Sequence, residues 1–178
     1  MTGTPVGGRV ATSDNPLRCA VLISGAGSGM QALVKAQQQD NLLHQTSVVI
    51  SNRSEAGGIQ LAHQLGVEVE LVLPPKSTEN TRVAHEQAIM EVLERHDIEF
   101  VVLSGYMRLL SPNFLSRWGG RIVNIHPSYL PHFPGAHAHR DVIASGAKLT
   151  GCTVHMVDEG MDTGAVLAQE TVPVLNGD

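Results

Sequence analysis

An asparagine and a histidine stand two positions apart at the end of an apolar run, in the stretch RIVNIHPSYLPHFPG at residues 121–135. Side chains two apart on a strand share a face, so we expect Asn124 and His126 to project to the same side. Pro127 cannot donate a ladder hydrogen bond and predicts where this strand ends. An amide NH2 donates to a developing oxyanion, and an imidazole accepts a proton or, when charged, donates to the same oxyanion. The pair therefore favours acyl or formyl transfer, although a lone histidine among nine is more often structural or merely exposed.

An acidic, glycine-containing loop, VDEGMDTG at residues 157–164, supplies a candidate partner for the histidine. Asp162 could orient His126 or stabilise its charge, in a base-plus-orienter arrangement. The alternative is that Asp158, Glu159 and Asp162 are turn and surface acids, which is the commoner fate of such residues. Sequence spacing alone does not bring Asp162 to His126, so both interpretations stay open.

A glycine-rich turn, SGAGSGMQ at residues 24–31, follows the first apolar run. Its glycines allow close backbone approach, and the helix expected after it points free N–H groups at any ligand there. A dinucleotide site is disfavoured, because Met30 replaces the third glycine of the fingerprint and Ser51-Asn52-Arg53 after the second strand contains no acid. No GK[ST] follows, which disfavours a Walker loop. The turn therefore predicts a site for a single phosphate, against the alternative of a plain strand-to-helix connection.

The chain as a whole alternates β-rich runs with helical patterns. We expect strands at residues 19–24, 47–51, 67–73, 100–104 and 121–125, and helices at 30–39, 55–65, 78–95 and 111–117. This order predicts a Rossmann-like α/β fold, with a mostly parallel twisted sheet, right-handed crossovers and helices on both faces. A later helix at 139–145 and strands at 151–157 and 165–174 are expected to extend the same sheet. Ligands of such sheets bind beyond the carboxyl ends of the strands, here at 25–29, 52–53, 105–108 and from 124 onward.

Composition limits the class of protein. The 178 residues are 42% hydrophobic and 16% charged, which predicts one globular domain at 18–178 after a flexible, glycine-rich lead-in at 1–17. A net charge of −5 argues against nucleic acid as a partner. The chain lacks an apolar run of about 18 residues and an N-terminal signal block, so we expect a cytoplasmic protein without a membrane partner.

Cysteines and histidines give little support for a metal. Cys19 and Cys152 have no CxxC spacing and are expected to be buried free thiols. His132, His137, His139 and His155 crowd one region, but no HExxH or comparable spacing occurs. His137 and His139 would also fall on different faces of a helix. We therefore expect no metal.

Several blocks of sequence together resemble phosphoribosylglycinamide formyltransferase, a folate-dependent enzyme family of purine biosynthesis. In order they are SGAGSGMQA, SNR, VVLSGYMRLLSP, NIHPSYLPHFPGAHAHRDV and TGCTVHMVDEGMDTGAVLAQETVPV, and the match runs from about residue 18 to 178. The resemblance implies the formyltransferase fold. It also implies transfer of a formyl group from the co-substrate 10-formyltetrahydrofolate to the amine of glycinamide ribonucleotide, without a metal.

The same resemblance implies roles for particular residues. Asn124, His126 and Asp162 would be catalytic, and Gly27, Ser28 and Gly29 would lie against the substrate phosphate. The residues implied on the folate side are Arg82, Met107, Arg108, Leu109, Leu110 and Val157. Two departures from the family pattern are Gly29, where relatives commonly have Asn, and the end of the chain at Asp178, where relatives continue through another helix of the ribose and phosphate site.

Other functions fit parts of the pattern. Formyltetrahydrofolate deformylase, in which water replaces the amine, generally has His where Pro127 stands and an additional N-terminal domain. A catalytically silent ligand-binding module on the same fold is the alternative from a different class, because fold does not fix function. The presence of Asn124, His126 and Asp162 together argues against the silent module. The sequence leaves the oligomeric state open.

Overall fold

The computed structural model describes residues 9–76 and 81–178, and these contain one seven-stranded sheet of order β3-β2-β1-β4-β5-β6-β7. The first five strands along the chain pair in parallel, whereas β6 pairs antiparallel with β5 on one side and with β7 on the other. Their bounds are β1 Leu17–Ile23, β2 His44–Ser51, β3 Glu68–Leu71, β4 Phe100–Ser104, β5 Ile122–His126, β6 Leu149–Met156 and β7 Val166–Pro173. The α/β class and the addition of the last two strands to the same sheet are confirmed.

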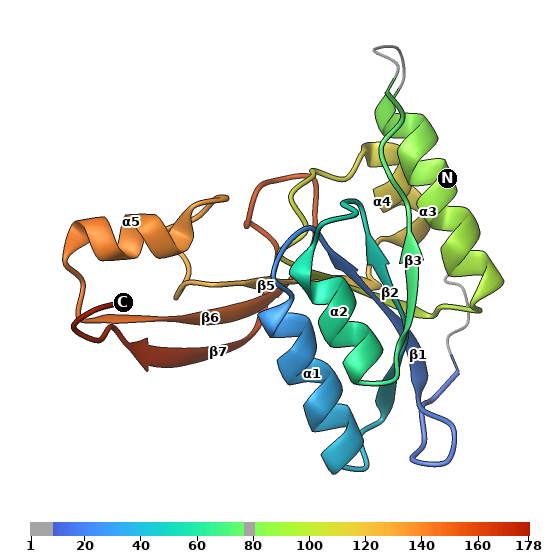
Figure 1. Cartoon of the computed structure of the whole chain (residues 1–178), viewed down its shortest axis with the longest axis horizontal. Coiled ribbons are helices and arrows are strands. Elements are labelled where there is room, and N and C mark those ends of the chain that lie inside the picture. The colour runs from blue at the N-terminus through green and yellow to red at the C-terminus, as the bar shows by residue number, and fades with distance from the viewer. Residues whose placement is uncertain (1–8, 77–80) are drawn as a thin grey trace.

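Helices cover both faces of the parallel part of the sheet (Figure 1). Their bounds are α1 Ser28–Gln39, α2 Gly57–Gln64, α3 Thr81–Arg95, α4 Pro112–Trp118 and α5 Ala138–Ser145. Strand β1 shows why two layers form, because its side chains are apolar on both sides. Val21 and Ile23 belong to a core with residues of α1 and α2, whereas Ala20 and Leu22 belong to a second core with residues of α3 and α4. Helix α5 lies apart from these four, above β6 and β7 in Figure 1.

The observed elements match the expected ones, with shifted ends. Strand β3 ends at Leu71, two residues before the expected end, ahead of Pro74 and Pro75, which lack a ladder donor. The helix expected at 78–95 is α3, and residues 78–80 lie outside the described residues. None of the described helices is both long enough and apolar enough to cross a bilayer.

The N-terminal stretch contacts the sheet region through one arginine. Arg9 Nε and Nη2 lie 2.7 and 2.8 Å from the two carboxylate oxygens of Glu99, and Arg9 Nη1 donates to the carbonyl of Asn15 at 2.6 Å. Leu17 already pairs with His44, so β1 begins two residues before the strand expected at 19–24. Residues 1–8 lie outside the described residues, and the flexibility expected of 1–17 stays a prediction.

The two cysteines are free, but only one is fully buried. Cys19 is 2% exposed, and burial raises the pKa of its thiol to about 11. Cys152 is half-buried, so its expected full burial is wrong. Strand β6 alternates buried and partly exposed residues, and Cys152 lies on the more exposed face.

Candidate active site

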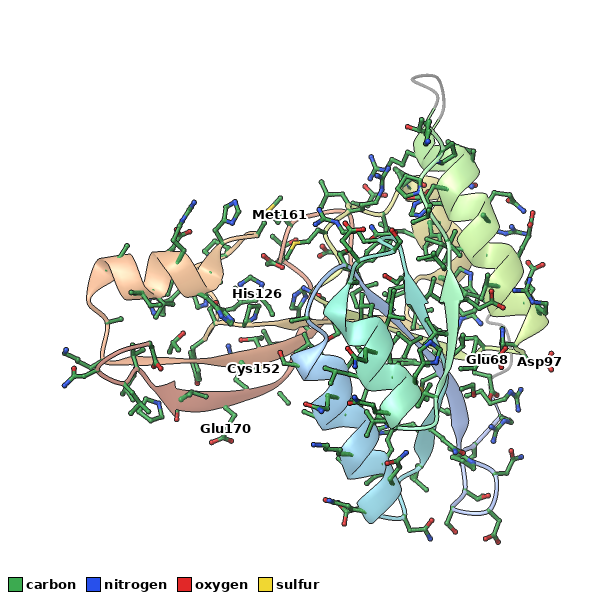
Figure 2. The ribbon with its side chains drawn as sticks, viewed as in Figure 1. Glu68, Asp97, His126, Cys152, Met161 and Glu170 are labelled. Atoms are coloured by element: carbon green, nitrogen blue, oxygen red, sulfur yellow. The ribbon has the colours of Figure 1, made fainter. Side chains whose placement is uncertain are left out.

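The candidate site lies at the carboxyl end of β5, the strand at which the sheet changes from parallel to antiparallel pairing. On one side Leu103 of β4 pairs with Asn124, and on the other Asn124 pairs with His155 of β6. His126 is the last residue of β5 and is 4% exposed. Figure 2 places His126 near the middle of the molecule, with Met161 above it.

The carboxylate of Asp162 lies between Asn124 and His126. Its Oδ1 is 3.4 Å from Asn124 Nδ2, and its Oδ2 is 3.5 Å from His126 Nδ1. The backbone N–H of Gly135 also donates to Oδ2, at 2.8 Å. The Asp162 side chain is only 9% exposed, so the alternative of a surface acid does not hold for it. The structure therefore brings together the three residues that the sequence singled out, from two segments 36 or more positions apart along the chain.

The neighbouring acid Asp158 has a structural role within the loop. Its carboxylate accepts from Gly160 N at 3.0 Å and from Thr163 Oγ1 at 2.8 Å, which closes the turn of this loop. Asp162 itself has φ 55°, a left-handed conformation that Asp tolerates better than most residues. The turn made by Asp158 therefore aims Asp162 inward.

The imidazole of His126 has a partner at each ring nitrogen. Nε2 lies 2.9 Å from the carbonyl oxygen of Phe133, which only accepts, so Nε2 carries a proton. Nδ1 faces the Asp162 carboxylate, so in the imidazolium form both nitrogens donate. Ser128 Oγ lies 2.6 Å from the His132 carbonyl and 3.0 Å from the Phe133 carbonyl, so its single proton holds this turn of the backbone in place. This arrangement suits a histidine that is charged when it acts.

His155 belongs to the same group, a position that the sequence did not predict. It is 3% exposed, and its Nε2 lies 3.2 Å from Asn124 Nδ2 and 3.4 Å from Asp162 Oδ1. Its Nδ1 donates to the Met156 carbonyl at 2.8 Å, which leaves Nε2 to accept from the Asn124 amide. The cross-strand register that places His155 opposite Asn124 is not visible in the spacing of either segment.

The glycine turn lies beside this site. Gly27 precedes α1 with φ 79°, and a Cβ there would lie 2.6 Å from the Cα of Gly58. Helix α1 has neither a side-chain cap nor an acid in its first turn, so its first N–H groups stay available to an anion. A Cβ on Gly29 would lie 2.6 Å from Ser104 Oγ at the end of β4. The usual Asn of the family would therefore require the Ser104 side chain to move.

The loop that follows β4, residues 105–111, carries most of the residues expected on the folate side. Met107 and Leu109 are 55% and 59% exposed, whereas Leu110 and Val157 pack against the core below α3 and α4. Arg108 is half-buried. Arg82 Nη2 donates to the Leu109 carbonyl at 2.8 Å, so Arg82 holds this loop.

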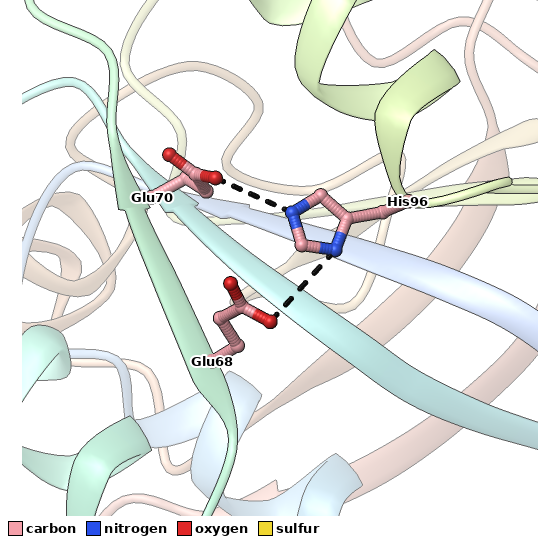
Figure 3. Close-up of side chains that lie close together, drawn as sticks. All are labelled: Glu68, Glu70 and His96. Carbon is pink, nitrogen blue, oxygen red and sulfur yellow. Dashed lines mark hydrogen bonds and ion pairs between the residues drawn. The ribbon is translucent and has the colours of Figure 1, made fainter.

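A group of three potential metal ligands lies elsewhere among the described residues, at Glu68, Glu70 and His96 (Figure 3). The two carboxylates approach opposite nitrogens of the ring, with Glu70 Oε1 3.3 Å from Nε2 and Glu68 Oε2 4.0 Å from Nδ1. Arg95 Nη2 already occupies Glu70 Oε1 at 2.5 Å. A metal would need both carboxylates on the side of one nitrogen, so the group is better described as an ion-pair cluster.

Comparison with known proteins agrees with this geometry. A formyl transferase family model matches residues 17–178. Phosphoribosylglycinamide formyltransferase of Bacillus subtilis is 41% identical over 155 residues, which cover 87% of this chain and 78% of that protein. The crystal structure of glycinamide ribonucleotide transformylase 1 from Symbiobacterium toebii has a TM-score of 0.82 at 40% identity, covering 92% of this chain and 76% of the other.

Another relative is much longer. The human trifunctional purine biosynthetic protein adenosine-3 is 44% identical over 161 residues, which cover 90% of this chain. The chain spans only 16% of the length of that protein. Taken with the family match and the bacterial relatives, this similarity shows that the chain belongs to the phosphoribosylglycinamide formyltransferases of the formyl transferase family.

Proposed function

We propose that this chain transfers the formyl group of 10-formyltetrahydrofolate to the amine of glycinamide ribonucleotide, in de novo purine biosynthesis. The observation that carries the proposal is the convergence of Asn124 and His126 on the buried carboxylate of Asp162. Two hydrogen-bond donors beside a carboxylate match the demands of a reaction that creates an oxyanion and moves a proton.

In the proposed reaction the amine nitrogen attacks the formyl carbon, and negative charge develops on the formyl oxygen. Asn124 and protonated His126 donate to this oxygen. In the structure the same two donors face Asp162 at long distances, 3.4 Å for Asn124 and 3.5 Å for His126. When the substrate binds, the formyl oxygen would take the place of the Asp162 carboxylate as their acceptor. The bond from carbon to N10 of the folate then breaks, and the proton lost by the amine passes by way of Asp162, through water, to N10. The products are the formylated amine and tetrahydrofolate.

The two substrates would approach from different elements. The phosphate of glycinamide ribonucleotide would bind the first turn of α1 at Gly27, Ser28 and Gly29, where N–H groups are free. The folate would lie along residues 105–111, against the exposed side chains of Met107 and Leu109. The other residues proposed for this side are Arg82, Arg108, Leu110 and Val157. The loop after β4 lies next to the end of β5, because Leu103 of β4 pairs with Asn124 of β5. The folate and the amine substrate would therefore meet at Asn124.

The test is formyl transfer by the purified chain and by His126→Ala, each with and without glycinamide ribonucleotide. We expect loss of 10-formyltetrahydrofolate only when the amine is present, and a fall of roughly 100-fold or more in the variant. Folate loss without the amine would instead indicate hydrolysis, as in a deformylase. A folded chain that binds both substrates without turnover would indicate a silent binding module.

A further inference from the structure

A buried carboxylate outside the catalytic group stands at one end of the loop 105–111. Glu86 of α3 is 3% exposed and faces no solvent that could hydrate its charge. Its Oε1 accepts from the backbone N–H of Ser111 at 2.7 Å, and its Oε2 accepts from Ser111 Oγ. A buried carboxylate that takes both donors of one residue fixes the backbone there closely.

The same carboxylate also positions Arg82, one turn earlier on α3. Arg82 Nε lies 3.6 Å from Glu86 Oε1, while Arg82 Nη2 donates to the carbonyl of Leu109 at 2.8 Å. Glu86 thus holds the loop twice, directly at Ser111 and through Arg82 at Leu109. The beginning of the loop is held separately by Ser24, whose Oγ accepts from Met107 N at 2.8 Å and whose N–H donates to the Gly105 carbonyl at 3.2 Å.

Between these anchors the loop presents apolar side chains outward. Met107 and Leu109 are more than half exposed, although each has its backbone hydrogen-bonded to a neighbouring element. Exposed apolar side chains on a fixed backbone form a preorganised surface, because little loop ordering remains to oppose binding. Loss of the Glu86 anchor would leave the Ser24 anchor in place and free only the later half of the loop.

We propose that Glu86 is a positioning residue for the formyl donor: it holds residues 109–111, and so the Leu109 side chain, in the conformation that binds the donor's ring system. The inference rests on the proposed function for the nature of the ligand. It assigns Glu86 no contact with either substrate, and it makes Arg82 partly a link between Glu86 and the loop. Because the contacts of Glu86 go to Ser111 and Arg82 and not to the first turn of α1, we expect binding of the phosphate substrate to be independent of Glu86.

The test compares Glu86→Gln with Glu94→Gln, an exposed glutamate on the same helix. Initial rates are measured with 10-formyltetrahydrofolate varied at saturating glycinamide ribonucleotide, and the reverse. For Glu86→Gln we expect the KM for the donor to rise about 10-fold, with kcat within about 2-fold and the KM for the amine substrate unchanged. Ser111→Ala, which keeps the backbone donor, should raise the same KM by roughly 3-fold. Glu94→Gln should behave as the parent chain.

Amide hydrogen exchange on the free proteins tests the inference without any turnover. In Glu86→Gln we expect faster exchange in residues 108–111 and unchanged exchange in β1, β4 and β5. Hydrogen exchange can be measured even if the chain shows no formyl transfer. Failure of the proposed function can therefore be told apart from failure of the positioning role of Glu86. Unchanged exchange in the loop would overturn the inference. So would equal changes in both KM values, or a fall in kcat alone, because these would point to a general structural or catalytic part for Glu86.

Discussion

The Asn124 amide serves two acceptors of the site at once. Nδ2 lies 3.2 Å from His155 Nε2 and 3.4 Å from Asp162 Oδ1. We expect Asn124→Ala to lower kcat by about 100- to 1000-fold, the usual effect of removing one oxyanion donor. Both KM values should change little, since the lost interaction forms only in the transition state. A steady-state comparison checks this, and a selective rise in one KM with kcat kept would contradict the oxyanion role.

The sequence predicted some of these residue positions and could not have predicted others. Asn124 and His126 share a face because side chains alternate on a strand, and this follows from local geometry alone. The approach of Asp162 depends on an antiparallel return of β6 and on a turn closed by Asp158. His155 depends on the same register. Neither is a local property, so spacing along the chain contains no signal for them.

At the scale of elements, the first turn of α1 is the proposed phosphate site, and it can be tested by charge. Ser28 is exposed and is the first residue of the helix. Ser28→Asp adds a negative charge that interacts favourably with the dipole of α1 but repels a bound phosphate. We expect stability to stay equal or rise by about 0.3–1 kcal/mol. We also expect the KM for glycinamide ribonucleotide to rise roughly 10-fold or more, with the KM for the folate unchanged.

Urea unfolding and initial rates of the Ser28→Asp variant give the two measurements. Ser28→Asn is the matched control, because the Asn side chain has nearly the same shape as that of Asp but carries no charge. An equal effect of both substitutions on the KM would mean that a side-chain contact, and not charge at the helix terminus, governs this site.

The ion-pair cluster of Figure 3 joins the end of α3 to the edge strand β3, and it predicts a pH-dependent contribution to stability. The pKa of the Glu70 carboxyl is lowered, first by the hydrogen bond from Arg95 and then by His96, against the opposing effect of burial. A carboxyl with a lower pKa in the folded state stabilises above its unfolded pKa of about 4.3, and this stability is lost as pH falls through the folded value.

Glu70→Gln should therefore lower the free energy of unfolding by roughly 0.5–1 kcal/mol at pH 7. The difference from the parent chain should begin to shrink as pH falls below about 4.3, where the unfolded carboxyl takes up its proton, and should vanish below the lowered pKa of the folded Glu70, where the carboxyl is uncharged in both states. Urea unfolding at pH 7 and at pH 3.5 measures it. A difference that stays constant across this range would show that packing, and not charge, accounts for the effect.

The elements themselves follow closely from the sequence, whereas their order in the sheet does not. Each expected strand and helix is present, and the bounds of β4 are those expected. The signals were apolar runs for strands buried on both faces and polar or glycine-rich breaks between them. Strand β1 lies at the centre of the five parallel strands, with β2 and β4 on either side. That arrangement depends on how the helices cover two faces, which no single segment specifies.

For the whole molecule, the strand β5 is the boundary between two kinds of sheet, and the candidate site is built from both. The parallel part contributes the α1 turn and the loop after β4, and the antiparallel part contributes His155 and the loop bearing Asp162. The two substrates would therefore bind separate elements of the parallel part and meet at β5. Each substrate alone should then stabilise the fold, and both together should stabilise it more.

A thermal denaturation series tests this arrangement. Glycinamide ribonucleotide at about 100 times its Kd should stabilise the chain by about 2.7 kcal/mol, and a folate analogue with carbon in place of N10 should do the same. For a domain of this size each would raise Tm by roughly 5–10 °C. In Ser28→Asp, with binding about 10-fold weaker, the first stabilisation should fall to about 1.4 kcal/mol at the same ligand concentration, which is roughly half of the parent shift, while the second stays. Because the phosphate and the folate are assigned to different elements, an equal reduction of both shifts in this variant would contradict the assignment, and a reduction of the first alone would support it.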